Sequence, residues 1–231
     1  MKIKHGMILA AGLGTRMQPI TLKTPKPVIK ISSKSLLDRA INLLINNGIE
    51  EIAINVHHLA DQIKNFINKK KYKAKIIISY EREELLDTGG GIFKAIKSFK
   101  EPFVVLNPDT LWSNAYCSEL RNLENLYFQK KKPCLLLVSK NLSYDSSFNG
   151  DFNLNNSIVS RDNNNELIFT GLQILNQNVF STIKDKIFSI NKIWDYLIKE
   201  NCLYGLESKQ NFYHLNTIEM YNKITRLNII D

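Results

Sequence analysis

Short apolar runs alternate with amphipathic stretches through the first 140 residues, and this alternation limits the folds open to the chain. The apolar runs have the length of buried strands, whereas the stretches between them repeat their apolar residues at helical spacing. The expected strands cover 6–11, 51–56, 74–80, 102–107 and 134–139. The expected helices cover 35–47, 60–69, 90–98 and 116–130. This order of elements is typical of a mostly parallel sheet covered by helices.

The second part of the chain has a less regular pattern. Asn and Asp accumulate between 149 and 165, in short alternating segments that predict hairpins or an inserted antiparallel region. Further strands are expected at 166–175 and 202–206, and further helices at 190–200 and 217–226. Because no linker and no internal repeat interrupts the pattern, we expect one compact α/β domain over residues 1–231.

The composition excludes several classes of protein. The 231 residues are 44% hydrophobic and 23% charged, which supplies a sizeable core and argues against disorder. No run approaches the roughly 18 apolar residues of a membrane helix, and the apolar stretch at 7–11 is too short for a signal peptide. The three cysteines form no CxxC pair and give no disulfide framework. We therefore expect a cytoplasmic protein without membrane contact.

The net charge of +9 raises the question of a nucleic-acid partner. The lysines gather in short runs at 69–71 and 130–132, without the interleaved aromatic side chains of a base-stacking surface. Lysine is abundant along the whole chain, so we expect no nucleic-acid binding. The positive charge remains compatible with an anionic small substrate.

A glycine-containing loop follows the first expected strand. Gly12 and Gly14 let backbone amides approach a ligand closely, and successive N–H groups can cradle an anion. Arg16 adds a planar charged fork that suits phosphate oxygens. Prolines on both sides fix the backbone at Lys26, which holds a second cation in the same loop. Two cations and several amides predict a triphosphate site, and the alternative is a tight turn without a ligand.

Two familiar nucleotide-binding fingerprints do not fit this loop. The Rossmann pattern needs a third glycine that opens a helix, but Met17 occupies that position and Pro19 follows. A Walker loop needs Gly-Lys-Ser/Thr, which is absent from the segment. The loop therefore predicts a phosphate site of another kind.

A run of three glycines, residues 89–91, follows Thr88 at the start of an expected helix. Glycine costs up to about 1 kcal/mol relative to alanine inside a helix, so the run calls for a reason. We interpret Thr88, Gly89 and Gly90 as a surface against which the nucleotide base lies. The alternative is a helix N-cap at Asp87 or Thr88 with incidental glycines.

Asp109 comes directly after the expected strand 102–107. The carboxyl ends of parallel strands are where α/β proteins bind ligands. Magnesium prefers carboxylate, phosphate and water oxygens. Asp109 is therefore predicted to bind Mg²⁺, and the alternative is a turn or N-cap aspartate.

The segment AAGLGTRMQPITLKTPKP, residues 10–27, closely resembles the signature of the sugar-phosphate nucleotidyltransferases, and later motifs follow in that family's order. The resemblance implies a three-layer α/β/α, Rossmann-like nucleotidyltransferase domain with a mixed, mostly parallel sheet. It implies a nucleotide-binding half at about 1–110 and a sugar-binding half at about 111–231. The implied partners are a nucleoside triphosphate and a sugar 1-phosphate, and the expected assembly is a monomer or small homo-oligomer.

The resemblance also implies roles for single residues. The positions that match the base- and ribose-reading backbone are Leu9, Ala10, Ala11 and Gly12. The positions that match phosphate contacts are Gly14, Thr15, Arg16 and Lys26. The positions assigned to the sugar are Asn107, Gly150, Asp151 and Gly171. Arg16, Lys26 and Asp109 form the implied catalytic set, which positions two repelling anions and neutralises charge in the transition state.

One motif departs from the family. The family's Trp-x-Asp-x-Gly-Thr segment, whose aspartate is a second metal ligand, reads FYHLNT here at 212–217. His214 takes the aspartate position and Asn216 the glycine position. Imidazole suits Mn²⁺ or Zn²⁺ better than Mg²⁺. We predict Asp109 and His214 as ligands of Mg²⁺, with Mn²⁺ as an alternative, while a weak ligand role for Asn216 and a purely hydrogen-bonding role for His214 stay open.

Within the family, the compact length and the segment LDTGGGIFKA at 86–95 resemble one branch. That branch transfers UMP from UTP to N-acetylmuramic acid 1-phosphate, in cell-wall sugar recycling or nucleotide-sugar synthesis. The alternative enzymes are of the mannose-1-phosphate guanylyltransferase or glucose-1-phosphate thymidylyltransferase type. A catalytically silent nucleotide-binding subunit is a further alternative, which the intact Arg16, Lys26 and Asp109 argue against.

Overall fold

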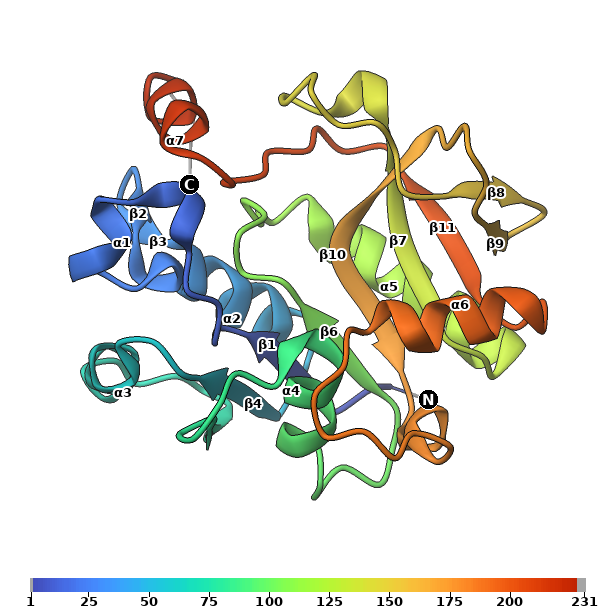
Figure 1. Cartoon of the computed structure of the whole chain (residues 1–231), viewed down its shortest axis with the longest axis horizontal. Coiled ribbons are helices and arrows are strands. Elements are labelled where there is room, and N and C mark those ends of the chain that lie inside the picture. Colours follow the sequence, from blue (N-terminus) through green and yellow to red (C-terminus); the bar gives the residue numbers. More distant parts are fainter. Residues whose placement is uncertain (1, 228–231) are drawn as a thin grey trace.

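The computed structural model describes residues 2–227, which fold around one nine-stranded sheet in the order β5-β4-β1-β6-β10-β7-β11-β9-β8 (Figure 1). Its strands are β1 (His5–Leu9), β4 (Glu51–Val56), β5 (Lys75–Tyr80), β6 (Phe103–Leu106), β7 (Cys134–Ser139), β8 (Asn153–Asn155), β9 (Ile158–Ser160), β10 (Leu167–Leu175) and β11 (Tyr204–Ser208). A small separate ladder pairs β2 (Lys30–Ile31) with β3 (Lys34–Ser35).

The sheet changes character at its middle. Strands β5, β4, β1 and β6 are all parallel, as the alternation of apolar runs and helices predicts. The long strand β10 then pairs antiparallel with both β6 and β7, because it returns from the β8–β9 hairpin. Beyond it, β11 is parallel to β7. The prediction of a mixed sheet is confirmed. Most pairs of parallel neighbouring strands belong to the first half of the chain.

The helices of the described residues agree with the predicted ranges, with ends that differ by up to three residues, except for the short first helix, which was not predicted from the sequence. They are α1 (Ile20–Lys23), α2 (Leu36–Asn46), α3 (Ala60–Asn68), α4 (Asp87–Ala95), α5 (Tyr116–Lys130), α6 (Asn191–Lys199) and α7 (Ile218–Thr225). Ser35 caps α2, since its side chain accepts a hydrogen bond from the amide of Asp38 at 3.1 Å. The largest difference is at α4, which begins three residues before the predicted start and so includes the glycine run.

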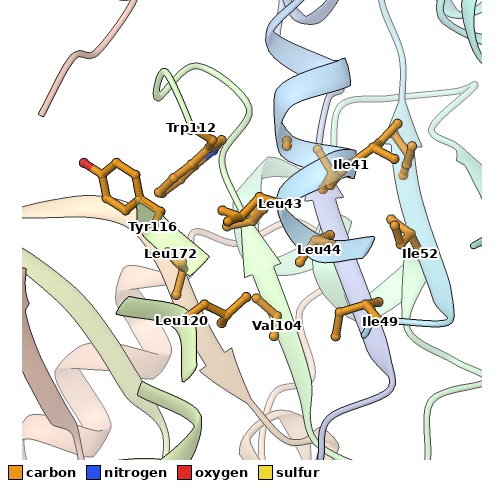
Figure 2. Close-up of a cluster of buried hydrophobic side chains, with 14 of the residues drawn as sticks. Ile41, Leu43, Leu44, Ile49, Ile52, Val104, Trp112, Tyr116, Leu120 and Leu172 are labelled. Atoms are coloured by element: carbon orange, nitrogen blue, oxygen red, sulfur yellow. The ribbon is translucent and has the colours of Figure 1, made fainter. Parts of the chain in front are cut away.

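Two apolar clusters cover the two faces of the sheet, because successive strand residues point to opposite faces. Along β1, Ile8 belongs to the cluster under α2, α3 and α5, whereas its neighbour Met7 belongs to the cluster under α4 and α6. Figure 2 shows part of the first cluster, where Leu44 of α2 and Leu120 of α5 lie near Val104 of β6. Helices on both faces give the expected three-layer arrangement.

None of the helices among the described residues combines the length and the apolar character needed to cross a membrane.

Candidate functional site

The largest group of predicted site residues surrounds a cavity of about 330 Å³ at the carboxyl ends of the parallel strands. The predicted residues on its wall are Leu9, Ala10, Ala11, Gly12, Gly14, Thr15, Arg16, Lys26, Thr88, Asn107 and Asp109. They come from the loop after β1, the start of α4 and the loop after β6. We call this space the first cavity.

The loop after β1 is shaped by one glycine. Gly14 has φ 65° and ψ 30°, in the left-handed region, and precedes a 3₁₀ turn over Thr15–Met17. A Cβ atom there would also lie 2.9 Å from Cγ2 of Thr21, whose hydroxyl donates to the Gly14 carbonyl at 2.8 Å. Buried Met17 holds the loop in the apolar cluster beneath it. As a result, exposed Arg16 lies on the cavity wall.

Two buried polar side chains that the sequence reasoning missed support this loop. Asn55, on β4, accepts a hydrogen bond from the amide of Ala10 at 2.8 Å and donates to Oε1 of Glu81 at 2.7 Å. Oε2 of Glu81 accepts from the amide of Leu86 at 2.9 Å. Both side chains are 2% exposed and both contribute to the first cavity. A polar residue inside the apolar run EIAINV was the available signal for Asn55.

The hydrogen-bond network of Asn55 and Glu81 contains an acidic side chain, whereas the loop carries the basic side chains Arg16 and Lys26. Arg16 and Lys26 contribute positive charge to the first cavity, whereas Glu81 contributes a carboxylate to its wall. Phosphates are favoured near the cations and disfavoured near that carboxylate. Asp109 adds a second carboxylate, which pairs with Lys26, so the part of the wall near Arg16 suits the phosphates of a nucleotide best.

Lys26 and His214 both contact Asp109. Nζ of Lys26 donates to Oδ2 of Asp109 at 2.7 Å, and Nε2 of His214 lies 3.1 Å from the same oxygen. Burial alone would raise the pKa of Asp109, but Lys26 first and then His214 outweigh it, and the pKa lies well below its usual range. Asp109 is therefore a carboxylate throughout the neutral pH range.

The oxygens around Asp109 fit a hard cation. Oδ1 of Asp109 and Oδ1 of Asn216 are buried and have no hydrogen-bond partner among residues 2–227. The Asn216 amide is oriented by its Nδ2 group, which donates to Oδ2 of Asp145 at 2.9 Å. Within the same residues, no three His, Cys, Asp or Glu side chains gather around a common point. This donor set fits Mg²⁺, which binds through few protein oxygens together with phosphates and water.

His214 contacts the other predicted ligand, Asp109, from the side of a different cavity. It lines a second cavity, described below, whereas Asp109 and Asn216 line the first. Its Nε2 atom is engaged with Asp109, and the ring stacks on Phe212 with centroids 5.9 Å apart. The contact of Nε2 with Asp109 is the kind of interaction that the purely hydrogen-bonding role of His214 predicts. A role of His214 as a metal ligand stays a prediction.

Gly89 and Gly90 do not lie where the base-contact interpretation expects them. They are buried within α4 and absent from the wall of the first cavity, on which Thr88 and Asp87 lie. Their amides both donate to the carbonyl of Phe188, at 2.9 and 3.1 Å. A Cβ atom on Gly89 would lie 2.3 Å from the Phe188 ring. Close packing of α4 against the segment 186–188 accounts for these glycines, and their contact with a base stays a prediction.

A second cavity of about 220 Å³ adjoins the first, and Asn107 lies on the wall of both. Asn107, Asp151 and Gly171 of the predicted sugar residues line it, together with His214. Gly171 has φ 90° at a register shift in β10, and its carbonyl accepts from the amide of Asn107 at 2.8 Å. The structure places Gly150 elsewhere, in a turn packed against the carbonyl of Asn165. Phe152 and Thr170, neighbours of the predicted Asp151 and Gly171, also line the second cavity. The residues on this wall that the sequence reasoning missed are Thr110, Phe148, Arg161, Phe169, Asn191, Trp194 and Phe212.

Comparison with known proteins agrees with this geometry. The N-acetylmuramate alpha-1-phosphate uridylyltransferase of Caulobacter vibrioides is 29% identical over 221 residues, which cover 92% of this chain and 91% of that protein. The D-glycero-alpha-D-manno-heptose 1-phosphate guanylyltransferase of Campylobacter jejuni is 28% identical, over 91% of this chain and 87% of that protein. Other, longer relatives are matched over 30% of their length.

The fold has solved counterparts. The crystal structure of HddC from Yersinia pseudotuberculosis, complexed with GMP-PN, matches with a TM-score of 0.79 and 24% identity, over 96% of this chain and 98% of that one. The family described as nucleotidyl transferase matches residues 5–140, which is more than half of the chain and includes Arg16, Lys26 and Asp109. The chain therefore belongs to the nucleotidyl transferase family, among the sugar-1-phosphate nucleotidyltransferases.

Proposed function

We propose that the protein transfers UMP from UTP to N-acetylmuramic acid 1-phosphate and releases pyrophosphate. The observation that carries this proposal is the pair of adjoining cavities, with Arg16, Lys26 and Asp109 on the first and Asn107 on both. The choice of UMP and of this sugar is supported by the Caulobacter vibrioides relative, which is similar over almost the whole chain.

In the proposed reaction, an oxygen of the sugar phosphate attacks the α-phosphorus of UTP in line. A new P–O bond forms as the bond from the α-phosphorus to the β-phosphate oxygen breaks, and pyrophosphate leaves with the electron pair. The protein needs no nucleophile of its own, because the sugar phosphate is already anionic. Its contribution is to position the two anions and to compensate their charge.

The residues of the first cavity divide this work. Lys26 holds its ammonium beside Asp109, where it can compensate charge on the reacting phosphates. Arg16, exposed on the loop, can hold the departing pyrophosphate. Asp109 and Asn216 would hold Mg²⁺, which when bound neutralises charge on the phosphate oxygens. Asn55 keeps the loop after β1 in place through the Ala10 amide.

A substrate panel tests the proposal. We expect pyrophosphate release with UTP and N-acetylmuramic acid 1-phosphate, and a loss of about 10²-fold or more in Asp109→Ala, because the carboxylate that would hold the charge-neutralising Mg²⁺ is removed. Unchanged release in Asp109→Ala would refute the assigned role of that residue. GTP belongs in the panel, since the similarity to the Campylobacter jejuni guanylyltransferase supports GMP transfer as the second candidate. Activity with GTP and a sugar 1-phosphate, but not with UTP, would make GTP the nucleotide donor in place of UTP.

A further inference from the structure

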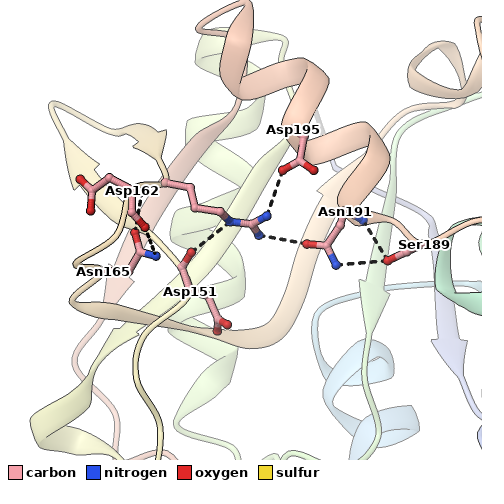
Figure 3. Close-up of polar contacts among 7 residues, drawn as sticks. Asp151, Asp162, Asn165, Ser189, Asn191 and Asp195 are labelled. Atoms are coloured by element: carbon pink, nitrogen blue, oxygen red, sulfur yellow. Dashed lines mark hydrogen bonds and ion pairs between the residues drawn. The ribbon is translucent and has the colours of Figure 1, made fainter.

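The second cavity holds a guanidinium that the reaction described above does not use. Arg161 follows β9, and its Nε donates to the backbone carbonyl of Asp151 at 3.2 Å. Nη1 donates to Oδ1 of Asp195 at 2.9 Å and Nη2 to Oδ1 of Asn191 at 3.0 Å (Figure 3). The guanidinium also lies over the ring of Phe152, 4.5 Å from its centre. Contacts from the hairpin and from α6 therefore fix its position.

The contacts of Arg161 leave donor capacity for a ligand. A guanidinium has five N–H groups, and these contacts use one on each nitrogen, so one N–H remains on each terminal nitrogen. Two N–H groups on the terminal nitrogens match the two oxygens of a carboxylate. The Asp195 side chain is 60% exposed, so water screens its pairing with Arg161 and the positive charge is only partly compensated.

The rest of the second cavity fits the body of a sugar. Trp194 meets the rings of Phe152 and Phe169 edge-on, with centroid distances of 5.6 and 4.9 Å; of these three residues on the wall, Phe169 is the partly exposed one. Apolar C–H faces of a hexose pack well against such surfaces. Asp151 also lines the cavity, with Oδ2 accepting from the amide of Phe169 at 2.9 Å, and it suits hydroxyl or amide donors.

The two cavities set the direction in which a sugar 1-phosphate extends. Its phosphate belongs beside Lys26 and Asp109 on the first cavity, next to the shared residue Asn107. Its ring then extends into the second cavity, where Arg161 is a charged donor on the wall. A substituent with two acidic oxygens would find the unused N–H groups there.

We propose that Arg161 is a specificity-determining residue that binds a carboxylate carried by the sugar 1-phosphate. The inference rests on the proposed nucleotide transfer to a sugar 1-phosphate, and the lactyl group of N-acetylmuramic acid 1-phosphate is one such carboxylate. A neutral sugar leaves the two N–H groups to water. Arg161 therefore strengthens the binding of the acidic sugar and leaves the chemical step unchanged.

Two matched pairs of sugars test this role. N-acetylmuramic acid 1-phosphate is compared with N-acetylglucosamine 1-phosphate, and glucuronic acid 1-phosphate with glucose 1-phosphate; only the first of each pair has the carboxylate. KM and kcat are measured for each sugar by pyrophosphate release at saturating UTP. In Arg161→Gln we expect KM for the acidic sugar to rise about 10- to 100-fold, the effect of one charged hydrogen-bonded contact. KM for the neutral sugar, KM for UTP and kcat should stay the same.

Three further variants separate recognition from structure. Arg161→Lys keeps the charge but loses the fork, so it should recover only part of the affinity. Asp195→Asn removes the screened competitor for the guanidinium and should lower KM for the acidic sugar by about 2- to 5-fold. Arg121→Gln, at an exposed position of α5, is the matched control and should change nothing. A structural role alone would weaken both sugars of a pair equally.

The outcomes distinguish this inference from the proposed function. Turnover with an unchanged acid preference in Arg161→Gln, or an equal loss for both sugars, overturns the inference and leaves the nucleotide transfer standing. An Arg161-dependent preference confined to the glucuronic acid pair supports the inference and refutes the muramic acid substrate. If no sugar is turned over, the proposed function fails, and calorimetric binding of the same four sugars to wild type and Arg161→Gln decides the role of Arg161.

Discussion

Gly90→Ala is expected to destabilise the fold without touching the nucleotide. A Cβ atom at this position would lie 2.3 Å from the carbonyl oxygen of Lys186 and 3.2 Å from Cβ of Leu86. The nearest neighbour is backbone, so the strain falls near the upper end of the range for overpacking, about 3 kcal/mol. Alanine in place of glycine in a helix returns about 1 kcal/mol. The net loss of about 2 kcal/mol corresponds to a drop in Tm of about 4–8 °C for a chain of this size.

Thermal unfolding measured by circular dichroism checks this loss, with KM for UTP measured beside it. Gly12→Ala is the matched control, because a Cβ atom there would meet nothing within 4 Å while Gly12 lines the first cavity. We expect Gly12→Ala to keep the wild-type Tm and to raise KM for UTP. The reasoning is refuted if Gly90→Ala keeps its Tm but weakens UTP binding, since Gly90 would then contact the base.

Four other predictions concern Asn55, Lys26 and Cys134. Asn55→Leu leaves the amide of Ala10 and Oε1 of buried Glu81 without these hydrogen bonds, while Oε2 of Glu81 keeps the Leu86 amide. We therefore expect a loss of about 3 kcal/mol in unfolding free energy by urea titration, together with a higher KM for UTP. Lys26→Met should lower kcat by about 10²-fold in the pyrophosphate assay. Lys26 helps to hold the pKa of Asp109 below its usual value, so the ionised Asp109 carboxylate stabilises the fold at neutral pH. This stabilisation is lost as the pH falls and the carboxylate is protonated. The Tm difference between wild type and Lys26→Met should therefore shrink below about pH 4. Burial raises the pKa of Cys134 to about 12, so a thiol reagent at pH 8 should label it only after unfolding, unlike the two partly exposed cysteines.

Local patterns were sufficient to predict most of the elements and most of the first cavity, but not α1, the β2–β3 ladder or the buried pair Asn55 and Glu81. The loop after β1 and Asp109 lie at the carboxyl ends of parallel strands, so a correct order of strands already brings them together. The predicted strand over 102–107 and the observed β6 differ by only one residue at each end. A site built from strand ends in one half of a sheet is therefore accessible to sequence reasoning.

Contacts between distant segments could not be predicted in this way. The partner of the glycine run is Phe188, almost 100 residues further along the chain, so the run alone does not distinguish a packed helix from a base contact. Arg161 lies in a segment rich in Asn and Asp, and its relation to Asp195 appears only when the hairpin meets α6. The pairing of His214 with Asp109 likewise depends on the return of the chain after β11.

The antiparallel ladder between β6 and β10 has a consequence for how substrates meet. This ladder joins the two halves of the chain within one continuous sheet. Asn107, next to the ladder, lies on the wall of both cavities, and Gly171 lies on the wall of the second. A hinge motion between the two halves would have to break the backbone hydrogen bonds of the β6–β10 ladder. We therefore expect closure around the reactants to come from the peripheral loops, with the distance between the two cavities held by the sheet.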